Sequence, residues 1–243
     1  MPKYFIGFFI VLLFCSCKKE TEILSTASLS DYYPLQEGKY ITYDLDSTIF
    51  IKFGIADTVL HYQVQDRVDQ KITDNSGRTA FRIIRFIRQN AAQDWIPNTT
   101  FMVILTDNSI EFVEDNLRFI KLKQPVRENY TWKGNSYITA EPYPSYQFGS
   151  DFISDWHYAY KDVSAQAEIN SLHFDSTITV LERDEVIGNP AQVGDGYAEK
   201  TFSVEKYAKG IGLIYKEFLH WEYQGAYGTY TGFGIKMSII DHN

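Results

Sequence analysis

The chain has 243 residues, 16% of them aromatic, and a formal net charge of −8 at pH 7. This charge argues against nucleic acid, whose phosphates select clustered Lys and Arg, and against docking on anionic lipid other than through an anchor. The two cysteines, Cys15 and Cys17, both lie near the N-terminus. The rest of the chain therefore offers no disulfide, Cys-ligated zinc or cysteine nucleophile.

The first 17 residues have the composition of a secretory signal. Lys3 precedes an apolar run of eleven residues at 4–14, and Ser16 then supplies a small residue. A helix of eleven residues is about 16 Å long, too short for a hydrocarbon layer of ~30 Å. We therefore predict a signal peptide over residues 1–16 and not a membrane-spanning helix.

The end of this leader, Phe14-Cys15-Ser16-Cys17, resembles the lipobox of bacterial lipoproteins. The resemblance implies cleavage before Cys17 and acylation of that residue, and two or more acyl chains attach a protein firmly to a membrane. An ordinary signal peptide with an incidental cysteine is the alternative. Residues 17–31 are polar and read as a tether that follows the lipidated cysteine.

Strand patterns begin immediately after this tether. Alternation of apolar and polar residues at 41–45 predicts a first strand. Residues 60–72 form a longer amphipathic strand pattern, in which Asp66 falls on the face that is otherwise apolar. Asp74-Asn75-Ser76-Gly77 is typical of a hairpin turn. Strands are expected next at 80–87, 101–105, 110–113 and 117–122. At 80–87 the apolar residues alternate less regularly, so a short helix is the alternative there, although Phe and Ile favour a strand.

The second half contains one expected helix among further strands. Residues 137–150 are rich in Pro, Tyr and Gly and read as a loop, whereas 163–172 is the one plausible, weak helix. Another long loop is expected over 186–197. The remaining strands are expected at 174–181, 202–207, 211–223 and 233–239.

About ten or more strands joined by short turns imply one antiparallel sheet. A sheet of that size closes into a barrel, curls into a half-barrel or splits into a sandwich. The length of the predicted strands favours strong curvature. We therefore expect an all-β fold with minor α content, a half-barrel or barrel, as a single domain over residues 32–243.

Two short motifs resemble a family of Bacteroidetes-type lipoproteins that has no settled activity. They are Tyr33-Pro34-Leu35 with Gly38, directly after the lipobox and tether, and the glycine-turn strand 207–217. The resemblance implies a β-rich body similar to the curved sheets of lipoprotein carriers. It also implies a cell-envelope location, in the outer membrane, facing either the periplasm or the surface.

Motifs for catalysis or cofactors are not evident in the sequence. It contains no Gly-x-Ser-x-Gly elbow and no phosphate-binding Gly-Lys-Ser/Thr loop. His157 beside Asp155, and His220 beside Glu222, have the i, i+2 spacing that puts two side chains on one strand face, which chance often produces. We assign no catalytic residue, no metal site and no cofactor.

Aromatic residues give the strongest functional signal. They form two groups, which could stack on sugars or line a concave sheet that holds an apolar ligand, unless they simply pack the core. The candidate ligand-binding residues are Tyr143, Tyr146, Trp156, Tyr158, Tyr160, Trp221, Tyr223, Tyr227 and Tyr230.

The sequence leaves three hypotheses for function. The first is a non-enzymatic envelope lipoprotein whose curved sheet binds a lipid, another apolar molecule, a glycan or an envelope protein. The second is a glycan hydrolase that uses a pair of carboxyl groups. The third is a structural component of an outer-membrane assembly.

Overall fold

The computed structural model describes residues 27–139, 141–142, 146, 148–149, 152–192, 194 and 196–243. In this part of the chain the fold is nearly all β, as expected. The elements are α1 (Leu29–Tyr32), β1 (Tyr40–Ile51), η1 (Lys52–Gly54), β2 (Ala56–Thr73), β3 (Thr79–Arg88), β4 (Ile96–Leu105), β5 (Ser109–Glu114), β6 (Leu117–Lys123), β7 (Thr131–Lys133), η2 (Ile153–Asp155), β8 (His157–Ile169), β9 (Leu172–Ile187), β10 (Tyr197–Ala208), β11 (Gly212–Gln224) and β12 (Thr229–His242).

All twelve strands belong to one antiparallel sheet, which forms a nearly closed barrel. The strand order is β6-β5-β4-β3-β2-β1-β12-β11-β10-β9-β8-β7, so consecutive strands pair, except β6 and β7 at the two edges, and β1 also pairs with β12. Hairpins explain most of this order, because an antiparallel pair needs only a tight turn; the connection from β7 to β8, over 134–156, is the long one. The turn at Asp74 is one of them: its side chain accepts hydrogen bonds from the amides of Ser76 and Arg78.

The sheet closes where its two edge strands meet. The amide of Ile120 in β6 donates to the carbonyl of Gly134, just after β7, at 2.7 Å. The indole Nε1 of Trp132 in β7 donates to the carbonyl of Ile120 at 2.8 Å. The hydroxyl of Tyr160 in β8 both accepts from the amide and donates to the carbonyl of Lys123. Both edges therefore have hydrogen-bond partners, which removes the hazard of an open edge.

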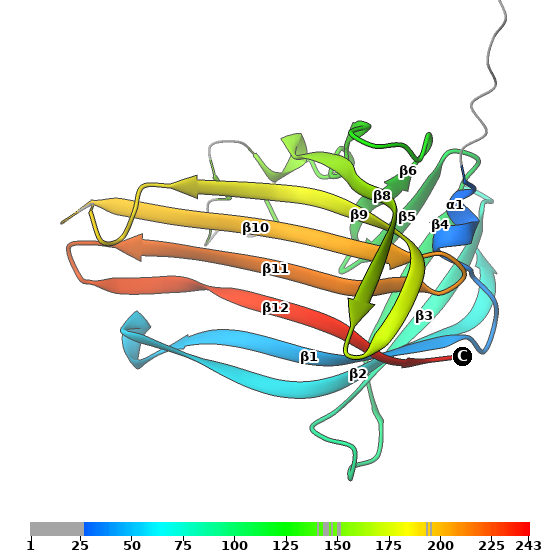
Figure 1. Ribbon diagram of the computed structural model, residues 1–243, viewed down its shortest axis with the longest axis horizontal. Helices are drawn as coiled ribbons and strands as arrows, with labels where there is room; N and C mark the ends of the chain where they lie inside the picture. Colours follow the sequence, from blue (N-terminus) through cyan, green and yellow to red (C-terminus); the bar gives the residue numbers. More distant parts are fainter. Residues whose placement is uncertain are drawn as a thin grey trace, which may run out of the picture.

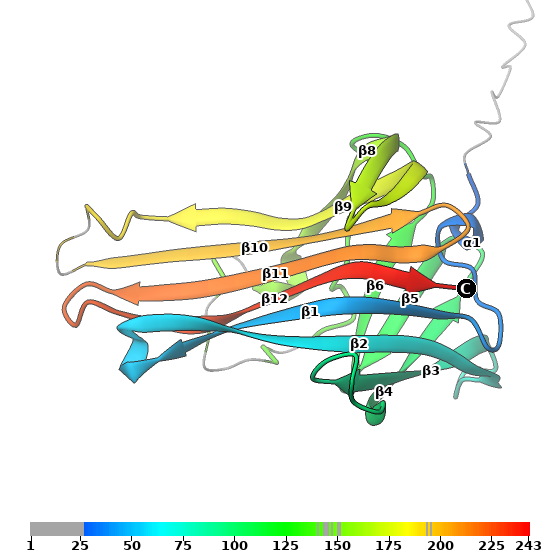
Figure 2. The same cartoon turned by 60° about the horizontal axis from the view of Figure 1, so that its bottom comes forward.

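The molecule has a closed end and an open end. The strands β9–β12, β1 and β2 run well beyond β3–β8 at this open end, so the sheet projects as an extended, curved surface (Figures 1 and 2). The helical turn α1 lies at the closed end. There Leu29 and Tyr32 are buried in the core, so packing begins slightly before the predicted boundary at residue 32.

The predicted helix at 163–172 is wrong, because these residues continue β8 and begin β9. Positive φ angles at Asp162 and Ser164 accompany irregular register between β8 and β9, and such bulges bend a strand. The bent hairpin folds across β10–β12 (Figure 1), where the amide Nδ2 of Asn170 donates to the carbonyl of Ile239. Pairing with β9 thus overrides the weak helical preference of this Ala- and Glu-containing segment.

None of the helical segments in the described residues is long and apolar enough to cross a bilayer.

Candidate functional site: an apolar cavity with a buried charge network

The interior of the barrel contains a cavity of about 310 Å³ that opens to solvent. This volume is at the lower end of the range for ligand pockets, about 300–1,000 Å³. Its walls combine rings from β4–β6 with apolar side chains from β11 and β12 on the facing side. The apolar lining is Tyr33, Phe101, Phe112, Leu117, Phe119, Ile153, Trp156, Tyr158, Leu213, Phe218, Phe233, Ile235 and Met237.

A buried lysine is the centre of the polar part of the cavity. The ammonium of Lys121, from β6, lies 2.7 Å from Glu182 Oε1 and 2.8 Å from Glu205 Oε1, on the facing strands β9 and β10. Lys216 Nζ lies 3.4 Å from the same Glu205 oxygen. Two ammonium groups thus face two carboxylates, and the network (Lys121, Lys216, Glu182 and Glu205) carries no net charge.

Hydroxyl groups complete the coordination of both carboxylates. Ser203 Oγ donates to Glu182 Oε2 at 2.6 Å, and the phenol of Tyr207 donates to Glu205 Oε2 at 2.5 Å. Buried charges are tolerated when they are paired and hydrogen-bonded in this way. The network is therefore a rigid polar wall and not a set of mobile surface charges.

The pKa values of Lys121 and Glu205 keep these two groups ionised at neutral pH. Burial favours neutral Lys121, but the attraction of Glu182 and Glu205 is stronger and holds the pKa of Lys121 well above its usual range. Burial likewise opposes ionisation of Glu205, yet Lys121 and Lys216 lower the pKa of that carboxyl to about 2. Fixed charges of this kind can position a polar group of a ligand.

The same pKa values bear on the hydrolase hypothesis. Glu182 and Glu205 both accept a hydrogen bond from the one ammonium of Lys121, so two carboxylates do lie close together at the cavity wall. A glycosidase acid must hold a proton at working pH, which requires a raised pKa. The lowered pKa of Glu205 keeps that carboxyl ionised, so Glu205 does not fit the role of the proton donor.

A second buried ion pair lies at the cavity wall formed by β2 and β3. Asp66 accepts hydrogen bonds from Arg85 Nε at 2.6 Å and from Nη2 at 2.7 Å, and the guanidinium lies over the ring of Phe101. Burial opposes the charge of Arg85, but Asp66 raises its pKa further above the usual range. This bidentate pair explains why an acidic residue lies on the otherwise apolar face of β2.

The mouth of the cavity continues along the inner face of the open end. Ile235 lines the cavity and stands opposite Ser47 on β1, and Ser47 stands opposite Leu60 on β2. Directly opposed residues in an antiparallel sheet share a face, so Leu60 belongs to the inner face. Leu60 and Ile235 are 39% and 36% exposed. The apolar lining of the cavity thus extends to solvent.

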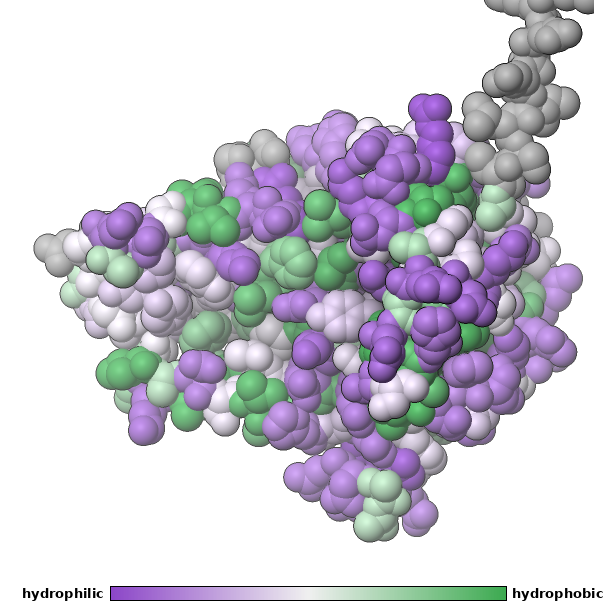
Figure 3. Space-filling model, viewed as in Figure 1, coloured by the Kyte–Doolittle hydropathy of each residue, from purple (hydrophilic) through white to green (hydrophobic). Residues whose placement is uncertain are grey.

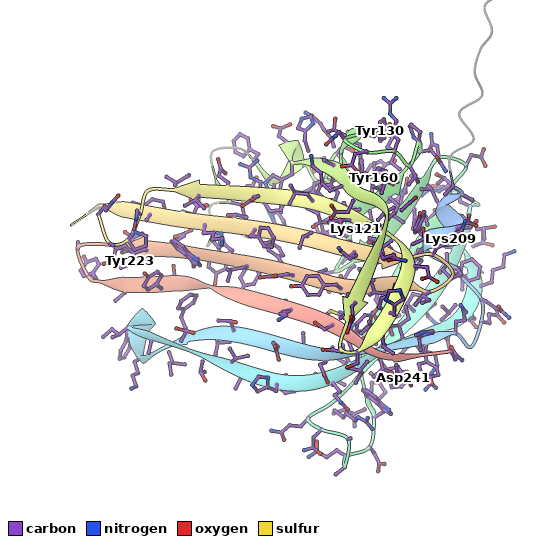
Figure 4. The ribbon with its side chains drawn as sticks, in the orientation of Figure 1. Lys121, Tyr130, Tyr160, Lys209, Tyr223 and Asp241 are labelled. Carbon is purple, nitrogen blue, oxygen red and sulfur yellow. The ribbon has the colours of Figure 1, made fainter. Side chains whose placement is uncertain are left out.

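The candidate aromatics separate into two sets. Trp156 and Tyr158 are buried and line the cavity, and Tyr160 is buried where the barrel closes (Figure 4). Tyr146 packs edge-on against His220 and Phe233. Tyr143 and Cys17 lie outside the described residues.

The second aromatic set lies at the far end of the sheet, where Figure 4 shows Tyr223 on β11. Trp221 and Tyr223 each contact the ring of Tyr230, and Tyr227 is largely exposed in the β11–β12 turn. Tyr223 stands directly opposite Tyr230 in the register, whereas the buried His220 has the opposite parity on β11. This set therefore occupies the outer face, and the structure does not bring the two sets together.

One indole in the cavity has an unused donor. Trp156 is 2% exposed, and its Nε1 has no hydrogen-bond partner among the described residues. An unpaired buried N–H costs about 1–3 kcal/mol. The same nitrogen is closed to solvent, so the present packing leaves no room for a ligand acceptor beside it.

The structure treats the two histidine–carboxylate pairs differently: His220 Nε2 lies 3.6 Å from Glu222 Oε1, whereas Asp155 is engaged by a lysine. Asp155 is paired with Lys133 at 2.7 Å, a hydrogen bond that lowers the pKa of the carboxyl. The buried His220 forms a hydrogen bond between its Nδ1 and the hydroxyl of Thr201. Burial lowers the pKa of this imidazole to about 4. Within the described ranges no cluster of three or more His, Cys, Asp or Glu side chains could hold a metal ion.

Sequence reasoning missed the Lys121 network. In β10 the polar residues Thr201, Ser203 and Glu205 are buried, whereas Phe202 and Val204 are partly exposed. The alternation of polar and apolar residues along β10 is visible in the sequence. It predicts that the apolar residues face the inside of the barrel, whereas the structure places the polar ones there. Asp66 was the one member of the buried charges that gave a signal, because it interrupts an otherwise apolar parity.

Comparison with known proteins adds no family: no protein-family model matches the chain, and no curated protein matches its sequence.

Proposed function

We propose that this protein is a non-enzymatic binding protein that holds an apolar or amphiphilic ligand inside its barrel. The cavity carries this proposal, because it joins an apolar wall of rings and aliphatic side chains to a wall of paired charges. A concave site with an apolar wall and convergent polar groups is typical of ligand pockets. The ligand's chain lies against Phe218, Phe233 and Ile235, and its polar group lies at the charged wall that includes Lys216.

Binding of a fluorescent fatty acid, cis-parinaric acid, tests the proposal. We expect saturable binding by the wild type and at least about tenfold weaker binding by Ile235→Glu, since a carboxylate beside the ligand must be desolvated. Lys216→Met removes one cation of the charged wall but keeps a side chain of similar length, so it weakens binding of the acid more than binding of an apolar analogue without the carboxyl group.

Val59→Glu is the matched control. Val59 is 40% exposed, close to the value for Ile235, but it stands opposite Thr48 on the other face of the sheet. We expect unchanged affinity in this variant. If the wild type shows no saturable binding, or if Val59→Glu weakens binding as much as Ile235→Glu, the cavity is not the binding site.

We further propose that the protein is an envelope lipoprotein attached through acylated Cys17. The lipobox-like sequence Phe14-Cys15-Ser16-Cys17 supports this assignment. Metabolic labelling with a fatty-acid analogue is expected to mark the wild type and not Cys17→Ser. Equal label in both would contradict the anchor without affecting the proposal for the cavity.

A further inference from the structure

The open end of the sheet carries exposed apolar side chains on two neighbouring turns. Phe53 and Ile55, in the β1–β2 connection, are 99% and 72% exposed, and Tyr227 in the β11–β12 turn is 80% exposed. Figures 1 and 2 place both turns at the end opposite α1, and Figure 3 shows hydrophobic residues at the β1–β2 turn. We call this group of Phe53, Ile55 and Tyr227 the apolar tip.

The backbone holds Phe53 in its exposed position. Lys52, Phe53 and Gly54 have φ angles of 52°, 59° and 87°, a left-handed region that is unfavourable for Lys and Phe. Gly54 is packed so closely that an added Cβ would lie 2.1 Å from the carbonyl oxygen of Tyr230. The tip is therefore a fixed feature that presents a phenyl ring to solvent at an energetic cost.

Amphipathic rings lie immediately behind the tip on the outer face. Phe50 stacks on Tyr230 with ring centroids 5.8 Å apart, and Trp221 and Tyr223 contact Tyr230 at 5.6 and 4.8 Å. Trp and Tyr are enriched at the headgroup level of membranes, where one side of the ring is apolar and the other is wet. The tip therefore carries largely exposed apolar side chains, and rings with one polar side lie behind it. This change from apolar to amphipathic side chains matches the change from hydrocarbon to headgroups at a membrane surface.

The charge of the tip also fits a lipid surface. Segments 49–56 and 224–230 contain one charged residue, Lys52, and no carboxylate, although the whole chain has a net charge of −8. Insertion by apolar side chains does not need the basic surface that the rest of the protein lacks. Three protruding side chains are also too few for a stable protein interface, which buries about 1,200–2,000 Å².

From these observations we infer that the apolar tip inserts into a lipid bilayer. The inner face of the same end carries Ile49 and Leu60 next to Ile235 at the cavity mouth. A bilayer at the tip would therefore be a source of ligand for the cavity. This last step rests on the proposed binding function, whereas membrane contact by the tip does not.

A label at the tip tests insertion directly. The variants Phe53→Cys and Ile96→Cys are made in the full chain with Cys15→Ser and Cys17→Ser, and each is labelled with the environment-sensitive dye NBD. Ile96 is 60% exposed at the start of β4 and serves as the matched control. With phosphatidylcholine vesicles we expect a blue shift and a several-fold intensity gain at position 53, and neither at position 96.

Unlabelled variants measure the contribution of the tip. In vesicle co-sedimentation, Phe53→Ser with Ile55→Ser is expected to weaken partition at least about tenfold, the minimum for burying one large apolar side chain. Ile96→Ser should leave partition unchanged. An unshifted dye at position 53, or equal shifts at positions 53 and 96, would overturn insertion even if cis-parinaric acid binds the cavity.

Discussion

Replacing Lys121 with Met removes the central cation of the buried network while keeping a side chain of similar length. Glu182 and Glu205 then face each other at the cavity wall, with Lys216 as the remaining cation, 3.4 Å from Glu205. Removing one partner of a buried ion pair costs about 3–5 kcal/mol in free energy of unfolding. At about 2–4 °C per kcal/mol for a chain of this size, we expect Lys121→Met to melt at least about 6 °C below the wild type.

The wild type and Lys121→Met should also differ in how the free energy of unfolding depends on pH. In the wild type the pKa of Glu205 is lowered from 4.5 to about 2, so its contribution is complete above pH 4.5 and is lost as the pH falls toward 2. The shift corresponds to about 3 kcal/mol. In Lys121→Met, burial raises the pKa of the carboxyls, so stability should increase on acidification from pH 7 to 5.

Urea denaturation between pH 5 and 8 measures both effects. Lys133→Met is the matched control, because Lys133 also forms a 2.7 Å ion pair but both side chains are about half exposed, and exposed pairs contribute about 0–1 kcal/mol. The double variant Lys121→Met with Glu205→Gln should recover part of the loss. A loss below about 1 kcal/mol with the pH profile of the wild type would refute the reasoning.

Two other perturbations test the backbone at the tip and the buried imidazole. Gly54→Ala should lower the melting temperature by more than Gly38→Ala. Both glycines have φ near 87°, but an added Cβ meets the backbone of Tyr230 only at Gly54. Equal losses in thermal melts would contradict that close approach. NMR titration of His220 should give a midpoint near pH 4, since burial lowers its pKa. Above pH 6.5 the ring is neutral in the folded and the unfolded state, and as the pH falls from 6.5 toward 4 the unfolded chain binds a proton that the folded state does not, so stability declines over this range. A midpoint near 6.5 would show that the ring is hydrated.

Much of the fold could be predicted from the sequence because strand signals are local. The alternation over 60–72 and the turn at Asp74 predict β2 and its hairpin with β3, and short connections imply neighbours in an antiparallel sheet. The barrel class followed from the number and length of the strands. Asp66 was conspicuous because one residue broke the apolar parity of its strand.

The orientation of several strands could be decided only by the tertiary structure. Alternation shows that two faces differ, but it does not say which face is inside when both carry apolar residues. In β10 the inner face is the polar one, because Glu205 meets Lys121, a residue 84 positions away. The segment at 163–172 is extended for a similar reason, since pairing with β9 outweighs a weak local preference for helix.

The sequence by itself determined the strand content, the hairpin turns and the abundance of aromatic rings, and the prediction of a leader with a lipidation site rests on it alone. Only the tertiary structure decided that Trp156 and Tyr158 line a cavity, that Trp221, Tyr223 and Tyr230 lie on the outer face, and that Lys121 joins Glu182 and Glu205. The physical reason is that composition and periodicity are local properties of the chain. A cavity and an ion network depend instead on how distant strands come together when the sheet closes.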